Sequence, residues 1–134
     1  MKLRMLLKSF AAVALTAAAS FGCTITPSVP AAQMARIVRP GSPPVTSVPF
    51  YIPVSVSSGC TLKFDELFNA YPLVATFEPS ASQPGTVGIT LADSGAPLPV
   101  LPFNASGMAV LEATDSSGQA TTATITVYFY GIGS

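Results

Sequence analysis

Strict two-residue alternation near the C-terminal end constrains the fold of this chain more than any other feature. In the segment 121–130, apolar side chains alternate with threonine and tyrosine: Ala123, Ile125, Val127 and Phe129 against Thr122, Thr124, Thr126, Tyr128 and Tyr130. Successive side chains of a β-strand point to opposite faces, so the pattern predicts a strand with one buried face. Weaker strand patterns lie at 50–56, 61–64, 73–77 and 86–92. Short strands at this spacing are typical of an all-β sandwich.

The composition agrees with strands and turns and excludes several classes of protein. The 134 residues include 13 prolines and 10 glycines, which disfavour long helices. Charged residues make up only 9% of the chain, and it has no histidine. These numbers exclude a basic nucleic-acid-binding protein and every site built on histidine.

The first 22 residues have the pattern of an export signal. Lys2, Arg4 and Lys8 precede an uncharged run over 10–19, and small residues follow it. This run is about half of the roughly 20 residues that a membrane-spanning helix needs. We therefore predict a signal peptide over 1–22 and an exported protein.

The two cysteines allow two fates for the new N-terminus. The sequence Ser20-Phe21-Gly22-Cys23 resembles the lipobox of bacterial lipoproteins. That resemblance implies lipid attachment at Cys23 and a lipoprotein held at the outer membrane or in the periplasm. Alternatively, Cys23 pairs with Cys60 in a disulfide, as cysteines of exported proteins often do, and the protein is secreted or lies on the cell surface. One sulfur atom cannot take part in both bonds, and the sequence leaves both open.

Prolines crowd the segment that follows the cysteine. Residues 23–48 include Pro27, Pro30, Pro40, Pro43 and Pro44, and their only charges are Arg36 and Arg39. Proline lacks a backbone donor and keeps its predecessor extended, so we predict a flexible tether over 23–48. A single folded domain over 49–134 then carries one lysine against six acidic residues.

Turn residues punctuate this domain. Asp93-Ser94-Gly95 and Asp115-Ser116-Ser117-Gly118 have the aspartate and glycine of tight turns. Over 65–71 we predict a single helical turn.

The closing segment also resembles a known family. Residues 107–127 read Gly-Met-Ala-Val-Leu-Glu-Ala-Thr-Asp-Ser-Ser-Gly-Gln-Ala-Thr-Thr-Ala-Thr-Ile-Thr-Val, which resembles the last hairpin of bacterial immunoglobulin-like domains. The resemblance implies an immunoglobulin-like β-sandwich outside the cytoplasm. It also implies a structural or adhesive module, with no catalytic residues.

The sequence contains few residues that could form a catalytic or ligand-binding site. Without histidine there is no Ser-His-Asp triad, and no phosphate loop or zinc-ligand motif occurs. Pairs among the six acidic residues leave a carboxylate-based hydrolase as an alternative: Asp65, Glu66, Glu78, Asp93, Glu112 and Asp115. We predict no enzymatic activity, no cofactor and no metal.

The function predicted from these features is that of a non-enzymatic structural or protein-binding module of the bacterial cell envelope. Tyrosines are common in protein interfaces, so Thr126, Tyr128 and Tyr130 are the predicted contact residues. Their contact would run either along the last strand or across its outward face. The predicted partners are other envelope or surface proteins, with the membrane reached through a lipid on Cys23 and nucleic acid excluded. A pilin-like subunit of a surface fibre, assembled by strand donation, is the alternative.

Overall fold

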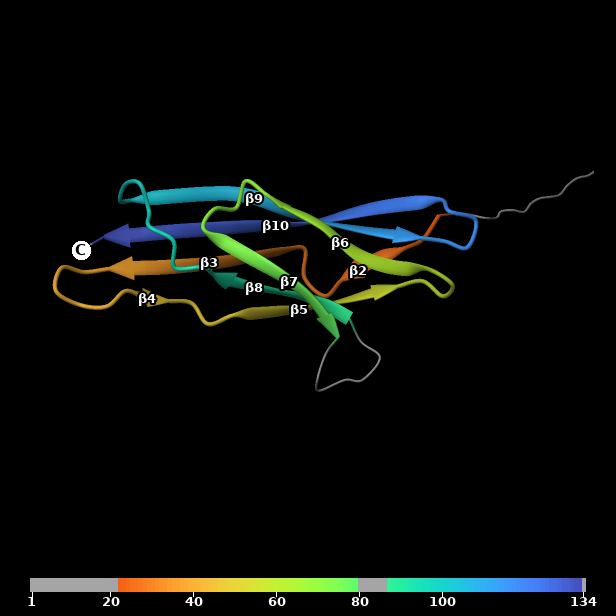
Figure 1. The fold of residues 1–134 in the computed structure, drawn as a ribbon, viewed down its shortest axis with the longest axis horizontal. Coiled ribbons are helices and arrows are strands. Elements are labelled where there is room, and N and C mark those ends of the chain that lie inside the picture. The colour runs from red at the N-terminus through yellow and green to blue at the C-terminus, as the bar shows by residue number, and fades with distance from the viewer. Residues whose placement is uncertain (1–21, 80–86, 134) are drawn as a thin grey trace, which may run out of the picture.

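A computed structural model describes residues 22–79 and 87–133, and every regular element in this part of the chain is a β-strand. The larger sheet contains five strands in the order β4-β3-β10-β9-β6, and the smaller contains four in the order β2-β5-β8-β7 (Figure 1). The larger sheet is formed by β4 (Val45–Thr46), β3 (Ala31–Val38), β10 (Ala120–Gly133), β9 (Phe103–Thr114) and β6 (Thr61–Phe68). The smaller is formed by β2 (Ile25–Pro27), β5 (Phe50–Val56), β8 (Val87–Asp93) and β7 (Leu73–Pro79).

Alternating side chains from both sheets form one shared core. Ile52, Ile89 and Leu91 of the smaller sheet and Leu111 and Phe129 of the larger one are fully buried. The predicted buried face of the last strand is confirmed, since Ile125, Val127 and Phe129 are at most 1% exposed. The all-β prediction is confirmed as well.

The prediction of a flexible tether over 23–48 is wrong, because this segment contributes strands to both sheets. β2 pairs with β5 in the smaller sheet, and the chain then crosses to the larger sheet, where β3 pairs in parallel with β10. Ala32 and Met34 of β3 are buried in the core. The folded unit therefore begins at or before Cys23, and not at residue 49.

The prolines of the segment 23–48 lie at strand boundaries or in the hairpin between β3 and β4, which explains why their number is misleading. Pro27 ends β2, and Pro30 directly precedes β3, where its carbonyl accepts the Thr126 N–H at 3.1 Å. Pro40, Pro43 and Pro44 lie in the hairpin between β3 and β4. Proline at such positions removes no ladder hydrogen bond. A high proline count is thus compatible with ordered strands between the prolines.

The predicted helical turn over 65–71 is also wrong. Residues up to Phe68 continue β6, whose register shifts between Phe64 and Glu66 in a β-bulge. Asn69 then takes a left-handed conformation with φ 55° as the chain leaves the larger sheet. A Cβ atom on Gly107 would lie 2.0 Å from the Phe68 carbonyl oxygen, so only glycine permits this close crossing.

The predicted turn at Asp115 is confirmed. Its carboxylate accepts hydrogen bonds from the backbone N–H groups of Ser117 and Gln119, both at 2.9 Å. The Ser117 hydroxyl also donates to this carboxylate at 2.7 Å, and it is the main cause that lowers the pKa of Asp115, followed by the Gln119 N–H. Of the predicted signal peptide over 1–22, residues 1–21 lie outside the described residues.

Candidate functional site

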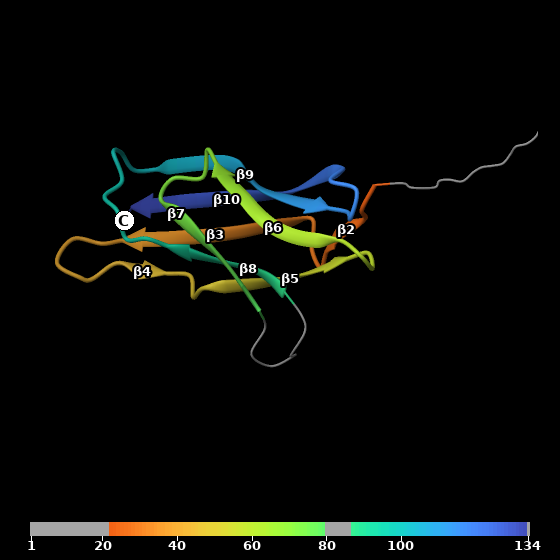
Figure 2. The ribbon, with the colours of Figure 1, turned by 45° about the vertical axis from the view of Figure 1, so that its right-hand side comes forward.

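The three predicted contact residues share the outward face of β10. Thr126, Tyr128 and Tyr130 are half-buried and alternate with the core residues of the same strand. β10 lies in the middle of the larger sheet, with β3 on one side and β9 on the other, as the views in Figures 1 and 2 both show. The neighbouring strands therefore determine what surrounds the tyrosines.

The strand register places uncharged polar and apolar side chains beside them. Tyr128 lies between Gln33 and Ser106, and Tyr130 lies between Ala35 and Asn104. Thr126 is followed across the sheet by Met108 and then Phe68, which are 37% and 46% exposed. We call this set the tyrosine surface: Gln33, Phe68, Asn104, Ser106, Met108, Thr126, Tyr128 and Tyr130.

On the same face, charge lies beyond Met108 and Phe68, at Glu66, Lys63 and Glu112. Lys63 and Glu112 are cross-strand neighbours, and the Lys63 ammonium lies 3.0 Å from the Glu112 carboxylate. That hydrogen bond and charge raise the pKa of Lys63. The tyrosine surface itself contains no charged residue. Many protein interfaces have this composition, with aromatic residues and methionine at the centre and charged residues toward the edge.

The pairing of β10 narrows the predicted mode of contact. Backbone contact at Thr126, Tyr128 and Tyr130 would need a free edge there, but β3 pairs with β10 from Thr126 onward and β9 pairs along its other edge. This part of the prediction is wrong. Contact across the outward face of the sheet remains.

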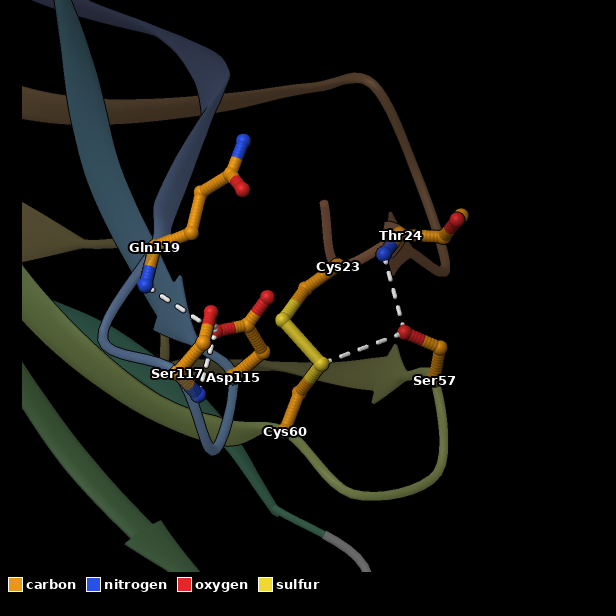
Figure 3. The surroundings of a disulfide bond; sticks show 7 residues. All are labelled: Cys23, Thr24, Ser57, Cys60, Asp115, Ser117 and Gln119. Atoms are coloured by element: carbon orange, nitrogen blue, oxygen red, sulfur yellow. Dashed lines mark hydrogen bonds between the residues drawn. A yellow bond between two sulfur atoms is a disulfide. The ribbon is translucent and has the colours of Figure 1, made fainter. Parts of the chain in front are cut away.

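The two cysteines form a disulfide at the end of the molecule where β9 turns into β10 (Figure 3). Cys23 is 5% exposed and belongs to the hydrophobic core, whereas Cys60 is half-buried. The Ser57 hydroxyl accepts the Thr24 N–H at 3.0 Å and lies 3.4 Å from the Cys60 sulfur. Of the two predicted fates of Cys23, the structure has the disulfide, which uses the sulfur atom that a lipid would need.

A buried ion pair connects the sheets farther along the molecule. The Arg36 guanidinium of β3 donates to both carboxylate oxygens of Asp93 of β8, at 2.8 and 2.5 Å. It also donates to the carbonyl oxygen of Ala96 at 2.8 Å. Asp93 accepts further bonds from the Thr46 hydroxyl at 2.6 Å and from the Gly95 N–H at 2.9 Å. The Arg36 hydrogen bond is the main cause that lowers the pKa of Asp93 to about 2, against the opposing effect of its burial.

Sequence reasoning missed Arg36, Phe68 and Met108. Arg36 was assigned to the tether, although Ala32, Met34 and Arg36 follow the period of two. Phe68 was hidden by the bulge in β6, which shifts the alternation by one residue. The two-residue alternation of a strand would therefore have placed Arg36 on the buried face, despite the prolines nearby. The same alternation, shifted by one residue at the bulge, would have placed Phe68 on the outward face.

In the part of the chain that the structure describes, no group of three potential metal-ligating side chains comes together. Two open hollows, of about 260 and 430 Å³, have no carboxylate in their linings. Among the same residues no helix could cross a bilayer.

No family model, curated protein or solved structure matches the chain.

Proposed function

We propose that the chain is an immunoglobulin-like module of an exported protein, and that it binds another protein of the cell envelope through the tyrosine surface. Strand order supports the fold. Immunoglobulin sandwiches have strands A, B, E and D in one sheet and C, F and G in the other. The order β2-β5-β8-β7 matches the first set, and β6-β9-β10 matches the second.

The disulfide supports export. Bonds of this kind persist in oxidising compartments and are rare in the cytosol. Cys23 directly follows the predicted signal peptide, and its bond to Cys60 fixes the beginning of the folded unit to β6. A periplasmic or cell-surface location fits a module built in this way.

The observation that carries the binding role is the composition of the tyrosine surface. Phe68 and Met108 are exposed side by side, next to two half-exposed tyrosines and without a charge among them. A solvated sheet face without a partner usually carries charged residues, as the other half of this face does at Lys63 and Glu112. The contrast within one face favours contact with an uncharged protein surface.

Site-specific photo-crosslinking tests this proposal. A photoreactive residue at Ser106, next to Tyr128, should give a discrete adduct in the envelope of the producing cell. The same residue at Ser55, which is exposed on the outward face of the smaller sheet, is the matched control and should give none. Equal adducts at both positions, or none at Ser106, would overturn the assignment of the surface.

A pair of double variants separates binding from folding. Tyr128→Ser with Tyr130→Ser should abolish the adduct from Ser106, and the circular dichroism spectrum should stay unchanged. Thr122→Ser with Thr124→Ser, on the same strand and face, should leave the adduct in place. An adduct that survives the tyrosine changes would show that the tyrosines do not form the contact.

A further inference from the structure

The four edge strands of the two sheets differ in how they are protected from pairing with another chain. Exposed edges are commonly protected by being short, by charged side chains or by a bulge. β4 has two residues and β2 has three. β6 is longer, but it carries Lys63, Asp65 and Glu66 and contains the bulge. Three edges thus have a recognisable protection.

The fourth edge, β7, has none of these protections. Its seven residues pair with β8 in one unbroken register, and proline occurs only at its last position. Glu78 is its single charged residue, and the carboxylate accepts a hydrogen bond from the Thr90 hydroxyl of the adjacent strand at 2.8 Å. The charge is thus engaged within its own sheet.

The backbone of β7 presents hydrogen-bonding groups outward at alternate residues. The Ser94 N–H donates to the Pro72 carbonyl, so residues 72, 74, 76 and 78 have their backbone groups toward β8. The groups of Ala75 and Phe77 therefore point away from the sheet. The backbone groups of Leu73 also point away from β8, but its N–H already donates to the Ala70 carbonyl at 2.8 Å. Ala75 and Phe77 are the two residues that offer both a donor and an acceptor at this edge.

We propose that β7 pairs with β7 of a second copy of this chain, antiparallel, about a two-fold axis at Thr76. In this register Ala75 exchanges two backbone hydrogen bonds with Phe77 of the partner subunit. The symmetry repeats the exchange on the other side of the axis. The two smaller sheets then form one continuous sheet of eight strands, four from each copy.

The strand itself favours a second copy as the occupant. A two-fold interface needs a surface that complements itself. The two residues with outward groups are equidistant from Thr76, so each meets the other in the partner. Threonine faces threonine at the axis, a favourable cross-strand pair. Val74 faces Glu78 of the partner subunit, so the two glutamates do not oppose each other. Pro72 and Pro79 bracket the strand and disfavour longer, shifted registers.

Engineered disulfides test the register directly. Thr76 and Thr76 of the partner subunit would form a non-hydrogen-bonded pair with Cα atoms about 4.5 Å apart, within the range of about 4.4–6.8 Å that a disulfide spans. Thr76→Cys should therefore give a covalent dimer under mild oxidation. Val74→Cys, equally exposed but about 13 Å from its counterpart at about 3.4 Å per residue, should not. Equal crosslinking of both variants, or none with Thr76→Cys, would overturn the register.

Sedimentation of the unmodified protein tests the dimer itself. The protein with its native disulfide should sediment as a dimer. Ala75→Pro, which removes an outward N–H, should sediment as a monomer with an unchanged circular dichroism spectrum. If Ala75→Pro fails to fold, Thr76→Lys serves instead, because it places two lysines at the axis; Thr122→Lys, on the other sheet, is the control that should remain dimeric. A monomeric wild-type protein, or irregular larger assemblies, would overturn the proposal.

Discussion

The two connections between the sheets, the disulfide and the buried ion pair, use different chemistry for the same structural task. Cys23 precedes the first strand of the smaller sheet and is bonded to Cys60, which precedes β6 of the larger sheet. Arg36 of the larger sheet is paired with Asp93 of the smaller one. Both connections involve the segment 23–38, which crosses from one sheet to the other. The comparison shows that this segment fastens the sheets together, once covalently and once through charge.

The two connections stabilise the fold for different reasons. A disulfide acts mainly by restricting the unfolded chain, here over a sequence separation of 37 residues. A buried ion pair must offset the loss of hydration, so its contribution depends on complete hydrogen bonding. Arg36 and Asp93 meet this condition through Thr46, Gly95 and Ala96. The Arg36 guanidinium also lies 5.8 Å from the centre of the Phe129 ring. One connection should therefore respond to reductants and the other to acid.

The largest effect is expected from removing one member of the ion pair. Asp93→Ala leaves the Arg36 charge buried without its partner, and such a loss costs about 3–5 kcal/mol. Urea unfolding at neutral pH measures it. Arg36→Met combined with Asp93→Ala should cost less than the sum of the two single changes, because no buried charge remains. A cost below about 1 kcal/mol for Asp93→Ala would mean that the pair is not buried as described.

Removing the disulfide should have a slightly smaller effect. The double variant Cys23→Ala with Cys60→Ala should lose about 3–4 kcal/mol in the free energy of unfolding, from the entropy of the opened loop. Reducing agent should destabilise the wild-type protein and leave this variant unaffected. When Asp93→Ala is combined with the two cysteine changes, the losses in the free energy of unfolding should be nearly additive, since the two connections share no partners. Strong coupling would contradict their independence.

Acid should weaken the ion pair and spare the disulfide. Asp93 has a folded pKa of about 2, below its ordinary value of 3.8, so its contribution is present above about pH 4. We expect about 2 kcal/mol to be lost as the pH falls from about 4 to 2, from about 1.4 kcal/mol per pKa unit. Asp93→Asn should remove this part of the pH dependence, and the variant without the disulfide should keep it. Identical pH profiles for wild type and Asp93→Asn would contradict the assignment.

The hydroxyl group beside each connection contributes through single hydrogen bonds, and the two hydroxyl groups should differ in their contributions. Thr46→Val removes a hydrogen bond to a buried carboxylate and should cost about 1.5–3 kcal/mol, the range for bonds to charged groups. Ser57→Ala removes bonds at an exposed site beside the disulfide and should cost less than about 1 kcal/mol. Thermal unfolding of both variants under the same conditions checks the order. A larger loss for Ser57→Ala would reverse it.

The strands that the sequence predicted are those with an uninterrupted period of two. The segment 121–130 is the clearest case, since one register with β9 keeps Ile125, Val127 and Phe129 in the core. The turn at Asp115 could be predicted because its hydrogen bonds are local. The sequence leaves the disulfide as one of two alternatives, because the proximity of Cys23 and Cys60 exists only in three dimensions.

The strands that the sequence did not predict depend on contacts with distant segments. β3 is ordered by its parallel pairing with β10, about a hundred residues away in the chain, and local composition gives no sign of this. Arg36 is buried because Asp93 is there to pair with it. Phe68 joins the tyrosine surface only because the bulge in β6 turns it outward beside Met108. In each case a contact with a distant segment determines the structure, and the local sequence does not predict it.

Hydrogen exchange of the backbone amides in β3 tests most directly whether the proline-rich segment is part of the folded unit. We expect the amides of Met34 and Arg36, whose side chains are buried beneath the larger sheet, to exchange as slowly as those of Ile125 and Val127 in β10. Breaking the disulfide should speed the exchange near Cys23 more than that of β3. Exchange of the β3 amides at the rate of an unfolded peptide, with β10 still protected, would contradict the account and restore the tether.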